Sequence, residues 1–258
     1  MSDFPLPNTS SDLTGQVAFV TGATSGLGWR FARVLANAGA TVAITGRRKE
    51  RLDELAALIK SEGGKCVGFE LDMTSTDSIM KAVDDAEKEL GTITILVNNA
   101  GIPDAQYATK MSLELIDNVF DTNLRGPYVL SCEIARRLIG AKKPGRMVNI
   151  ASIAAYEYNG HGAALYSITK AGVVRMTEAL AVEWARFGIN VNGIAPGLFQ
   201  SEMSEGMMER IPNMADHYPR KRVCQPPQLD STLVYLCAPA SECVTGTVIK
   251  IDDGQGPR

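Results

Sequence analysis

The chain has 258 residues, of which 45% are hydrophobic, 21% charged and 6% aromatic, with a formal net charge of -3. This composition is typical of a globular protein near the upper size of one hydrophobic core. The slightly acidic balance argues against nucleic acid and anionic membrane surfaces as partners. No apolar run reaches the ~18 residues of a membrane-spanning helix.

The termini and the cysteines predict a cytoplasmic protein. The first residues lack a basic segment followed by an apolar core, and the last five, Gly-Gln-Gly-Pro-Arg, match no retention or peroxisomal signal. Five cysteines without a C-x-x-C motif are expected to be reduced thiols. The two histidines, His161 and His217, have no paired cysteines nearby, so we expect no metal site.

Residues 1–14 are polar and proline-containing and are expected to form a tail, followed by one domain over residues 15–258. In that domain short β-branched runs alternate with amphipathic segments such as Arg51–Glu62. The runs are expected to be buried strands: Val17–Thr21, Thr41–Thr45, Lys65–Glu70, Ile93–Val97, Arg146–Ala151, Asn190–Ala195 and Thr247–Ile251. The alternation predicts a single doubly wound α/β domain of the Rossmann type, with about seven parallel strands and helices on both faces.

A glycine-rich turn follows the first predicted strand. Its sequence is Thr21-Gly22-Ala-Thr-Ser-Gly26-Leu-Gly28, and a helix is expected from Trp29 to Ala38. Glycines at such a junction let the backbone turn sharply and approach a pyrophosphate, which the free N–H groups of the helix N-terminus then bind. The spacing, G-x-x-x-G-x-G, differs from the G-x-G-x-x-G of many dinucleotide-binding domains.

The segment 197–227 interrupts the alternation and is too long for an ordinary connection between a strand and a helix. It carries four methionines and four prolines, namely Met203, Met207, Met208, Met214, Pro212, Pro219, Pro226 and Pro227. Two interpretations stay open. The methionines either pack against the core or form an apolar lid over a substrate site.

Tyr166 and Lys170 lie four residues apart in a segment that is predicted to be helical, so their side chains share one face. An ammonium beside a phenol favours the phenolate and is expected to lower the pKa of the tyrosine from its usual value of ~10. Such a tyrosine can transfer a proton near neutral pH. A pair of this kind is common on protein surfaces, so its meaning depends on the rest of the chain.

Several motifs occur together in one order. They are the glycine-rich turn, Asn98-Asn99-Ala100-Gly101 after the fourth strand, Asn123, Ser152, Tyr166-x-x-x-Lys170 and Pro196-Gly197. This combination resembles the short-chain dehydrogenase/reductase family in its single-domain branch, over residues 13–254. Within that family the chain is similar to 3-oxoacyl thioester and carbonyl reductases.

The resemblance implies a role for four residues. Tyr166 is expected to be the general acid in reduction and the general base in oxidation, and Lys170 to lower its pKa and bind the nicotinamide ribose. Ser152 is expected to hydrogen-bond the substrate oxygen, and Asn123 to hold a water that links Lys170 to solvent. Each residue alone also has a plain structural explanation, and their joint occurrence favours catalysis.

The end of the second predicted strand indicates which nicotinamide cofactor is used. NAD enzymes place an acidic residue about 20 residues after the glycine motif, whereas this chain has Gly46 followed by Arg47 and Arg48. Arginines bind a 2′-phosphate through charge-assisted hydrogen bonds, so we predict NADP(H), although the two could instead be exposed residues of a helix start. The expected cofactor-binding residues are Gly22, Thr24, Ser25, Gly26, Leu27, Gly28, Arg47, Arg48, Asp72, Met73, Asn99, Ala100, Gly101, Tyr166, Lys170, Pro196, Gly197, Phe199 and Ser201.

The predicted function is NADP(H)-dependent interconversion of a ketone and a secondary alcohol, on a hydrophobic or acyl-type substrate. The expected substrate-binding residues are Ser152, Ala154, His161, Tyr166, Leu198, Met203 and Met207. The sequence Val223-Cys-Gln-Pro-Pro departs from the pattern of the 3-oxoacyl reductase subgroup, which argues against a carrier-protein substrate.

Two alternatives stay open. One is an NAD-dependent secondary-alcohol, steroid or sugar dehydrogenase of the same family, and the other is a non-catalytic NADP(H)-binding module that senses redox state. An epimerase or dehydratase of the extended branch would need a longer C-terminal substrate domain. The resemblance also implies a homotetramer or homodimer that forms through the helices carrying Asn123 and Tyr166.

Overall fold

The structure is a computed structural model that describes residues 8–158, 160, 162–211 and 213–257. Seven parallel strands form one sheet in the order β3-β2-β1-β4-β5-β6-β7, which confirms the predicted fold class. The strands are β1 (Val17–Val20), β2 (Thr41–Gly46), β3 (Lys65–Glu70), β4 (Ile95–Asn98), β5 (Gly145–Ile150), β6 (Ile189–Pro196) and β7 (Val248–Ile251). Each predicted strand boundary lies within two residues of the observed one.

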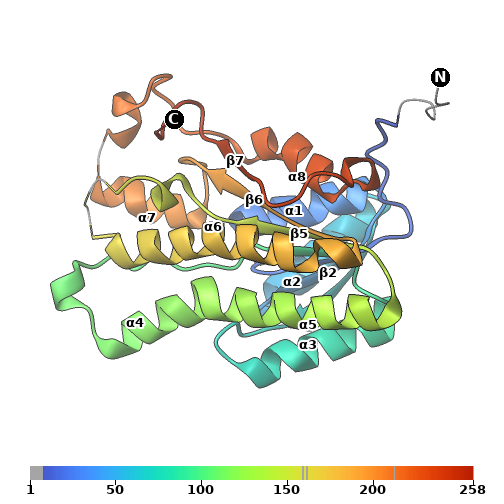
Figure 1. Cartoon of the computed structure of the whole chain (residues 1–258). Coiled ribbons are helices and arrows are strands. Elements are labelled where there is room, and N and C mark those ends of the chain that lie inside the picture. The colour runs from blue at the N-terminus through green and yellow to red at the C-terminus, as the bar shows by residue number, and fades with distance from the viewer. Residues whose placement is uncertain (1–7, 159, 161, 212, 258) are drawn as a thin grey trace.

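Helices cover both faces of the sheet (Figure 1). They are α1 (Gly26–Asn37), α2 (Lys49–Ser61), α3 (Thr76–Leu90), α4 (Leu113–Phe120), α5 (Gly126–Ala141), α6 (Ala164–Trp184), α7 (Glu202–Arg210) and α8 (Asp230–Cys237). One apolar cluster packs α1, α2 and α8 against the sheet, and a second packs α3, α5 and α6 against the opposite face. The core is therefore divided into two layers by the sheet, as parallel sheets require.

The long helix α6 forms one wall of the molecule and lies against β6 (Figure 1). Its buried side chains recur every three or four residues, at Leu165, Thr169, Val173, Met176 and Leu180. That spacing produces a stripe along one side of a helix, and the stripe packs on the sheet. Lys170 lies on the same buried side of α6 and is 4% exposed.

A buried hydrogen-bonded chain fixes α6 relative to the middle of the sheet. The Asn98 amide donates to the side-chain oxygen of Asn149 at 2.8 Å and to the Ser131 hydroxyl at 2.9 Å. The Asn149 amide in turn donates to the Thr177 hydroxyl at 2.9 Å. Because buried polar groups are costly when unpaired, this chain specifies how β4, β5, α5 and α6 fit together.

The packed domain begins before residue 15. Leu13 is completely buried in the core and its backbone N–H donates to the carbonyl of Ala38 at 2.8 Å, although the predicted tail included it. In the part of the chain that the structure describes, every helix is too short or too polar to cross a membrane.

Candidate active site

A cleft of about 780 Å³ runs along the carboxyl ends of the strands. It opens where the strand order reverses on either side of β1, which is the place where open α/β sheets bind their ligands. Nearly all of the expected catalytic, cofactor-binding and substrate-binding residues line the cleft. The exceptions are Gly28 and Asn123, which do not line it, and His161, which is outside the described residues.

Two glycines of the turn after β1 lie where there is no room for a side chain. Gly22 adopts a φ of 66°, and a Cβ atom there would lie 2.8 Å from the Cα of Ala100. At Gly28 a Cβ would lie 2.3 Å from the carbonyl oxygen of Gly22. Gly28 is buried and away from the cleft, so it serves the close packing of α1 on the turn rather than direct contact with a ligand.

The N-terminus of α1 points its first residues into the cleft, which Ser25, Gly26 and Leu27 line. Ser25 is the N-cap residue, but its side chain makes no capping hydrogen bond. Helix N-terminal N–H groups that lack a side-chain acceptor are a binding site for an anion. The residues of this turn therefore fit the pyrophosphate of a dinucleotide.

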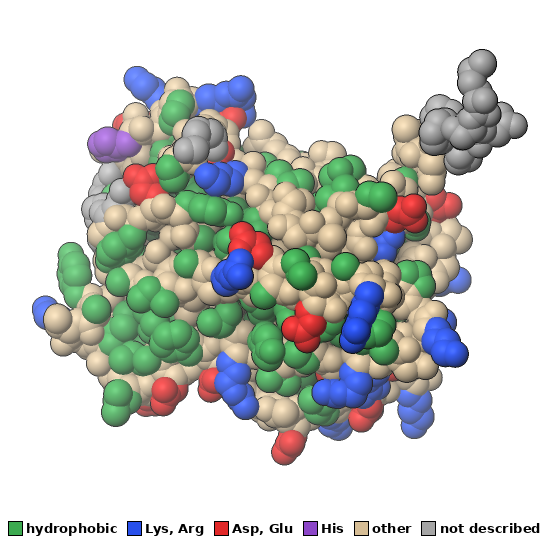
Figure 2. All heavy atoms as spheres, in the orientation of Figure 1, with side chains coloured by type: hydrophobic (Ala, Val, Ile, Leu, Met, Phe, Trp, Pro, Cys, Tyr) green, Lys and Arg blue, Asp and Glu red, His purple; other side chains and the backbone are tan. Residues whose placement is uncertain are grey.

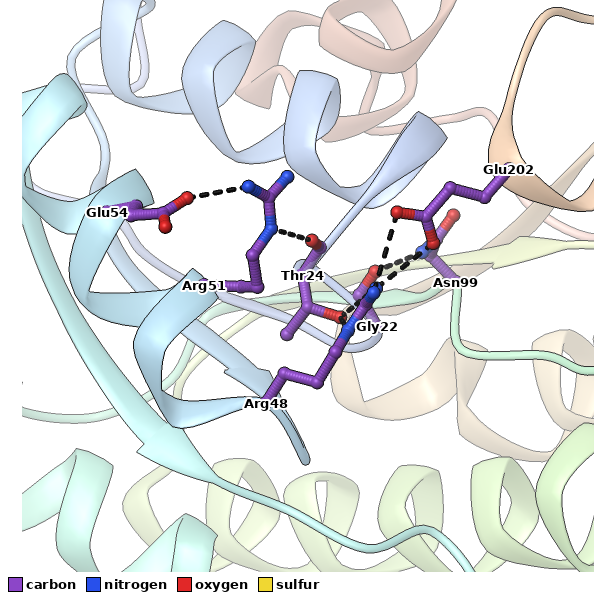
Figure 3. A network of polar contacts seen from close by, with 7 residues as sticks. All are labelled: Gly22, Thr24, Arg48, Arg51, Glu54, Asn99 and Glu202. Carbon is purple, nitrogen blue, oxygen red and sulfur yellow. Dashed lines mark hydrogen bonds and ion pairs between the residues drawn. The ribbon is translucent and has the colours of Figure 1, made fainter.

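Figure 3 shows three side chains converging beside this turn, where Thr24 and Glu202 approach the guanidinium of Arg48. Arg48 donates to the Thr24 hydroxyl at 3.0 Å and pairs with the Glu202 carboxylate at 3.2 Å. Arg51 pairs with Glu54, stacks over the ring of Trp29 at 4.8 Å and also donates to the backbone carbonyl of Thr24 at 3.3 Å. Of these two arginines, Arg48 lines the cleft and Arg51 does not.

The end of β2 is shaped by Gly46. A Cβ there would lie 2.6 Å from the methyl group of Thr24, so a longer side chain would displace the residue that holds Arg48. Arg47 follows directly and also lines the cleft. At the end of the neighbouring strand β3, Asp72 accepts hydrogen bonds from the backbone and hydroxyl of Thr74, which lower the pKa of its carboxyl together with the charge of Arg47.

Tyr166 and Lys170 lie together at the centre of the cleft, on the first turns of α6. The Lys170 ammonium donates to the carbonyl of Ile150, the last residue of β5, at 2.7 Å and lies 5.6 Å from the centroid of the tyrosine ring. Burial lowers the pKa of Lys170 to about 8, because the charged form loses solvation. At neutral pH this group is therefore a cation that can release its proton readily.

The pKa of Tyr166 differs from the sequence expectation. Burial raises the pKa of the phenol above its usual value, and a hydrogen bond with the Ser152 hydroxyl only partly offsets this. The expectation of a lowered pKa was wrong for the protein alone, because the ammonium of Lys170 lies beside the ring and donates to Ile150 instead. The phenol is neutral at physiological pH and is a proton donor in that state.

Asn123 sits in a π-helical turn, η2 (Asp121–Arg125), between α4 and α5. Its side-chain amide binds the backbone of Ile102 in both directions, accepting at 2.8 Å and donating at 2.9 Å. A Cβ at Gly101 would lie 3.4 Å from the Asn123 oxygen and 3.5 Å from the Lys170 nitrogen. Asn123 therefore holds the loop after β4 beside Lys170 and lies behind the lining of the cleft.

Among its described residues, the long segment after β6 contains the α-helix α7 and the 3-10 turns Met214–His217 and Pro226–Leu229. Leu198 and Phe199 are buried and line the cleft, and the serine pair Ser201 and Ser204 forms a capping box that begins α7. Met203 and Met207 on α7 line the cleft, as the lid interpretation requires. The β-bridge between Phe199 and Cys224 joins the two ends of this segment.

Two contributions to the cleft were not found from the sequence. The C-terminal residues Gln255, Gly256 and Pro257 line it, and the Gln255 side chain accepts from the backbone of Leu198 at 2.6 Å. Asp104, in the loop after β4, also lines the cleft and is 4% exposed. A glutamine in a short polar tail carries no sequence signal, and the partners of Asp104 are distant in sequence.

The aspartates near the C-terminus have protein partners. Asp252 accepts from the backbone of Gly256 at 3.0 Å, and Asp253 pairs with Arg220 and Arg222. Across the described residues there is no group of three or more histidine, cysteine or acidic side chains arranged to hold a metal ion.

Comparison with known proteins gives consistent matches over almost the whole chain. The family model described as short chain dehydrogenase matches residues 16–211. The chain is 36% identical to the 3-oxoacyl-[acyl-carrier-protein] reductase FabG of Aquifex aeolicus, with 94% of this chain and 98% of the relative covered. It is 34% identical to the gluconate 5-dehydrogenase of Gluconobacter oxydans, with 94% and 95% covered.

A solved structure is also similar along its whole length. A variant of actinorhodin polyketide ketoreductase with NADPH superimposes with a TM-score of 0.90 at 30% identity, covering 98% of this chain and 100% of that one. Fold, order of motifs and family model agree: the chain belongs to the short-chain dehydrogenase/reductase family.

Proposed function

We propose that the protein is an NADP(H)-dependent reductase that interconverts a ketone and a secondary alcohol, with Tyr166 as general acid and base. The observation that carries this proposal is the placement of a neutral phenol, a serine hydroxyl and a buried ammonium in the wall of one dinucleotide-sized cleft. A module that only binds a dinucleotide has no need for these three groups at one point.

Each side chain has a task that its surroundings support. Ser152 hydrogen-bonds the phenol and is positioned to share the substrate oxygen with it, stabilising negative charge that develops there. In reduction Tyr166 donates its proton to that oxygen, and the Lys170 ammonium stabilises the phenolate that remains. Bound NADP(H) supplies the hydride in reduction and accepts it in oxidation.

The described residues at the substrate end of the cleft are mostly apolar, with the charged side chains of Arg210 and Glu157 also in its lining. Leu198, Met203 and Met207 line it beside Ala154, and these side chains bury carbon rather than charge. A hydrophobic carbonyl compound suits this lining better than a sugar acid. The matches to a gluconate dehydrogenase and an acyl reductase leave both substrate classes in the experimental panel.

The preference for NADP(H) rests on Arg48. Its guanidinium lies beside the phosphate-binding turn, and its pairing with Glu202 is half exposed to solvent. Exposed ion pairs of this kind contribute about 0–1 kcal/mol, so a 2′-phosphate can share or replace the carboxylate at little cost. Arg47 supplies a second positive charge at the same end of the cleft.

The oligomer is proposed from the apolar face in Figure 2, which shows hydrophobic side chains gathered over the helices α4, α5 and α6. Leu113, Ile168 and Val182 on this face are 79%, 58% and 81% exposed. We propose that this surface is covered in a homotetramer, because exposed apolar patches on helices mark association surfaces.

Catalysis by Tyr166 is tested with the Tyr166→Phe variant and a panel of β-keto esters, β-keto thioesters, cyclic ketones, steroids and sugars. NADPH oxidation by the wild type with at least one carbonyl is expected, and kcat should fall by about 10²–10⁴-fold in the variant. NADPH binding, followed by fluorescence, should be retained. Tyr128→Phe on the exposed face of α5 is the matched control. Retained turnover in Tyr166→Phe, or no turnover of any carbonyl by the wild type, would contradict the proposal.

Cofactor choice is tested by replacing the arginines one at a time with alanine. Arg48→Ala should lower kcat/KM for NADPH by about 10–100-fold, as the loss of a charge-assisted hydrogen bond predicts, and leave NADH kinetics nearly unchanged. Arg33→Ala is the control, since this side chain pairs with Glu62 and does not line the cleft. A wild-type preference for NADH, or equal effects of Arg48→Ala on both cofactors, would rule out the assignment.

The oligomeric state is measured by light scattering. A mass of four 27.7 kDa chains is expected. Val182→Glu, which places a charge on the apolar face, should reduce the mass. A wild-type protein of a single chain's mass is incompatible with the proposed tetramer.

A further inference from the structure

The helix that carries the catalytic residues is capped from a distant part of the chain. Its N-cap residue is Ala163, whose side chain has no hydrogen-bond acceptor. The carboxylate of Asp104 takes that place, accepting from the backbone N–H of Leu165 at 2.9 Å and of Tyr166 at 3.1 Å. A carboxylate at a helix N-terminus satisfies free N–H groups and interacts favourably with the helix dipole.

Asp104 is itself firmly held. It is 4% exposed, and its second carboxylate oxygen accepts from the backbone of Ala105 at 2.8 Å. Ala105 has a φ of 48°, an unfavourable conformation for a non-glycine residue that the surrounding contacts must maintain. On the N-terminal side, the same loop is bound through Ile102 to Asn123. The loop therefore connects η2 with the start of α6.

Few charges act on the Tyr166 phenol. Burial has the largest effect and raises the pKa of the phenol; among the described residues, the Ser152 hydrogen bond lowers it and the negative charge of Asp104 raises it. Lys170 lies 5.6 Å from the ring centroid on the same helix. Two further charged residues belong to segments packed against α6. Asp121 pairs with Arg125 of its own turn at 3.9 Å, and Glu157, after Ser152, is exposed.

We propose that Asp104 is a positioning residue of the catalytic centre, whose carboxylate caps α6 at Tyr166 and places a negative charge at the end of the helix that carries the phenol. The inference rests on the proposed role of Tyr166 and extends it to the direction of the reaction. A ketone reductase needs a neutral phenol as its resting acid, whereas an alcohol dehydrogenase needs the phenolate. The charge of Asp104 acts in the same direction as burial, toward the protonated phenol that reduction uses.

The test is an alkaline titration of the Tyr166 phenol by its tyrosinate absorbance. The signal of this one tyrosine is the difference between each protein and the same protein carrying Tyr166→Phe. Asp104→Asn keeps an acceptor for the helix N-terminus and removes the charge, so the midpoint should fall by at least about half a pH unit, a roughly threefold change in the phenolate ratio. In the alcohol-oxidation direction, the rise of kcat with pH should shift the same way.

Three further variants separate charge from folding. Asp104→Ser removes the charge and leaves a smaller hydroxyl in its place, and it should lower the midpoint if Asp104→Asn fails to fold. Asp104→Glu keeps the charge and should keep the midpoint near the wild-type value. Ser75→Ala removes the side-chain cap of α3, where Ser75 accepts from Ser78, and should lower the unfolding midpoint in urea without moving the phenol titration.

An unchanged or higher midpoint in a folded neutral variant would overturn the inference, and so would an equal fall in Asp104→Glu. If both neutral variants fail to fold, the Asp104→Glu result decides it alone. The titration requires no substrate or cofactor. Failure of the carbonyl panel would therefore disprove the proposed function without affecting this result, and the two failures are distinguishable.

Discussion

The structure around the cleft is organised by the burial of one ammonium group. Lys170 is 4% exposed, and its charge is compensated by the carbonyl of Ile150 and the face of the Tyr166 ring rather than by a carboxylate. A buried charge with so few partners is costly, and its lowered pKa of about 8 expresses that cost. The buried polar chain between Asn98, Asn149 and Thr177 keeps α6 in the position that this burial requires.

The parallel sheet brings the components of the site to one edge. The glycine-rich turn follows β1, the Asn99 turn follows β4, Ser152 follows β5, and Pro196 ends β6. Since all strands are parallel, these carboxyl ends meet at the same side of the sheet and line one cleft. Helices contribute what strands cannot, namely the free N–H groups of α1 and the phenol and ammonium of α6. The site is thus a consequence of topology as much as of individual residues.

The sheet could be predicted from the sequence because β-branched runs such as that of β2, Thr41–Gly46, are strong local signals. Most of the residues that line the cleft could also be predicted, because the motifs occur in a fixed order and Tyr166 and Lys170 share one face of a helix. Interactions between distant residues were not accessible in this way. The cap from Asp104 to Tyr166 joins residues 62 apart, and nothing local identifies it. The pKa of the phenol was predicted in the wrong direction because burial, which depends on the tertiary structure, raises it, while the Lys170 ammonium donates to Ile150.

Deuterium transfer from the cofactor to the substrate tests the central claim most directly. The wild type would be incubated with a β-keto ester and NADPH that carries deuterium on the transferring face of C4 of the nicotinamide, and the product analysed by mass spectrometry and NMR. We expect a secondary alcohol with one deuterium on the carbinol carbon and none on oxygen in ordinary water, formed far more slowly by Tyr166→Phe. An alcohol whose carbinol hydrogen comes from solvent would contradict direct hydride transfer at this site.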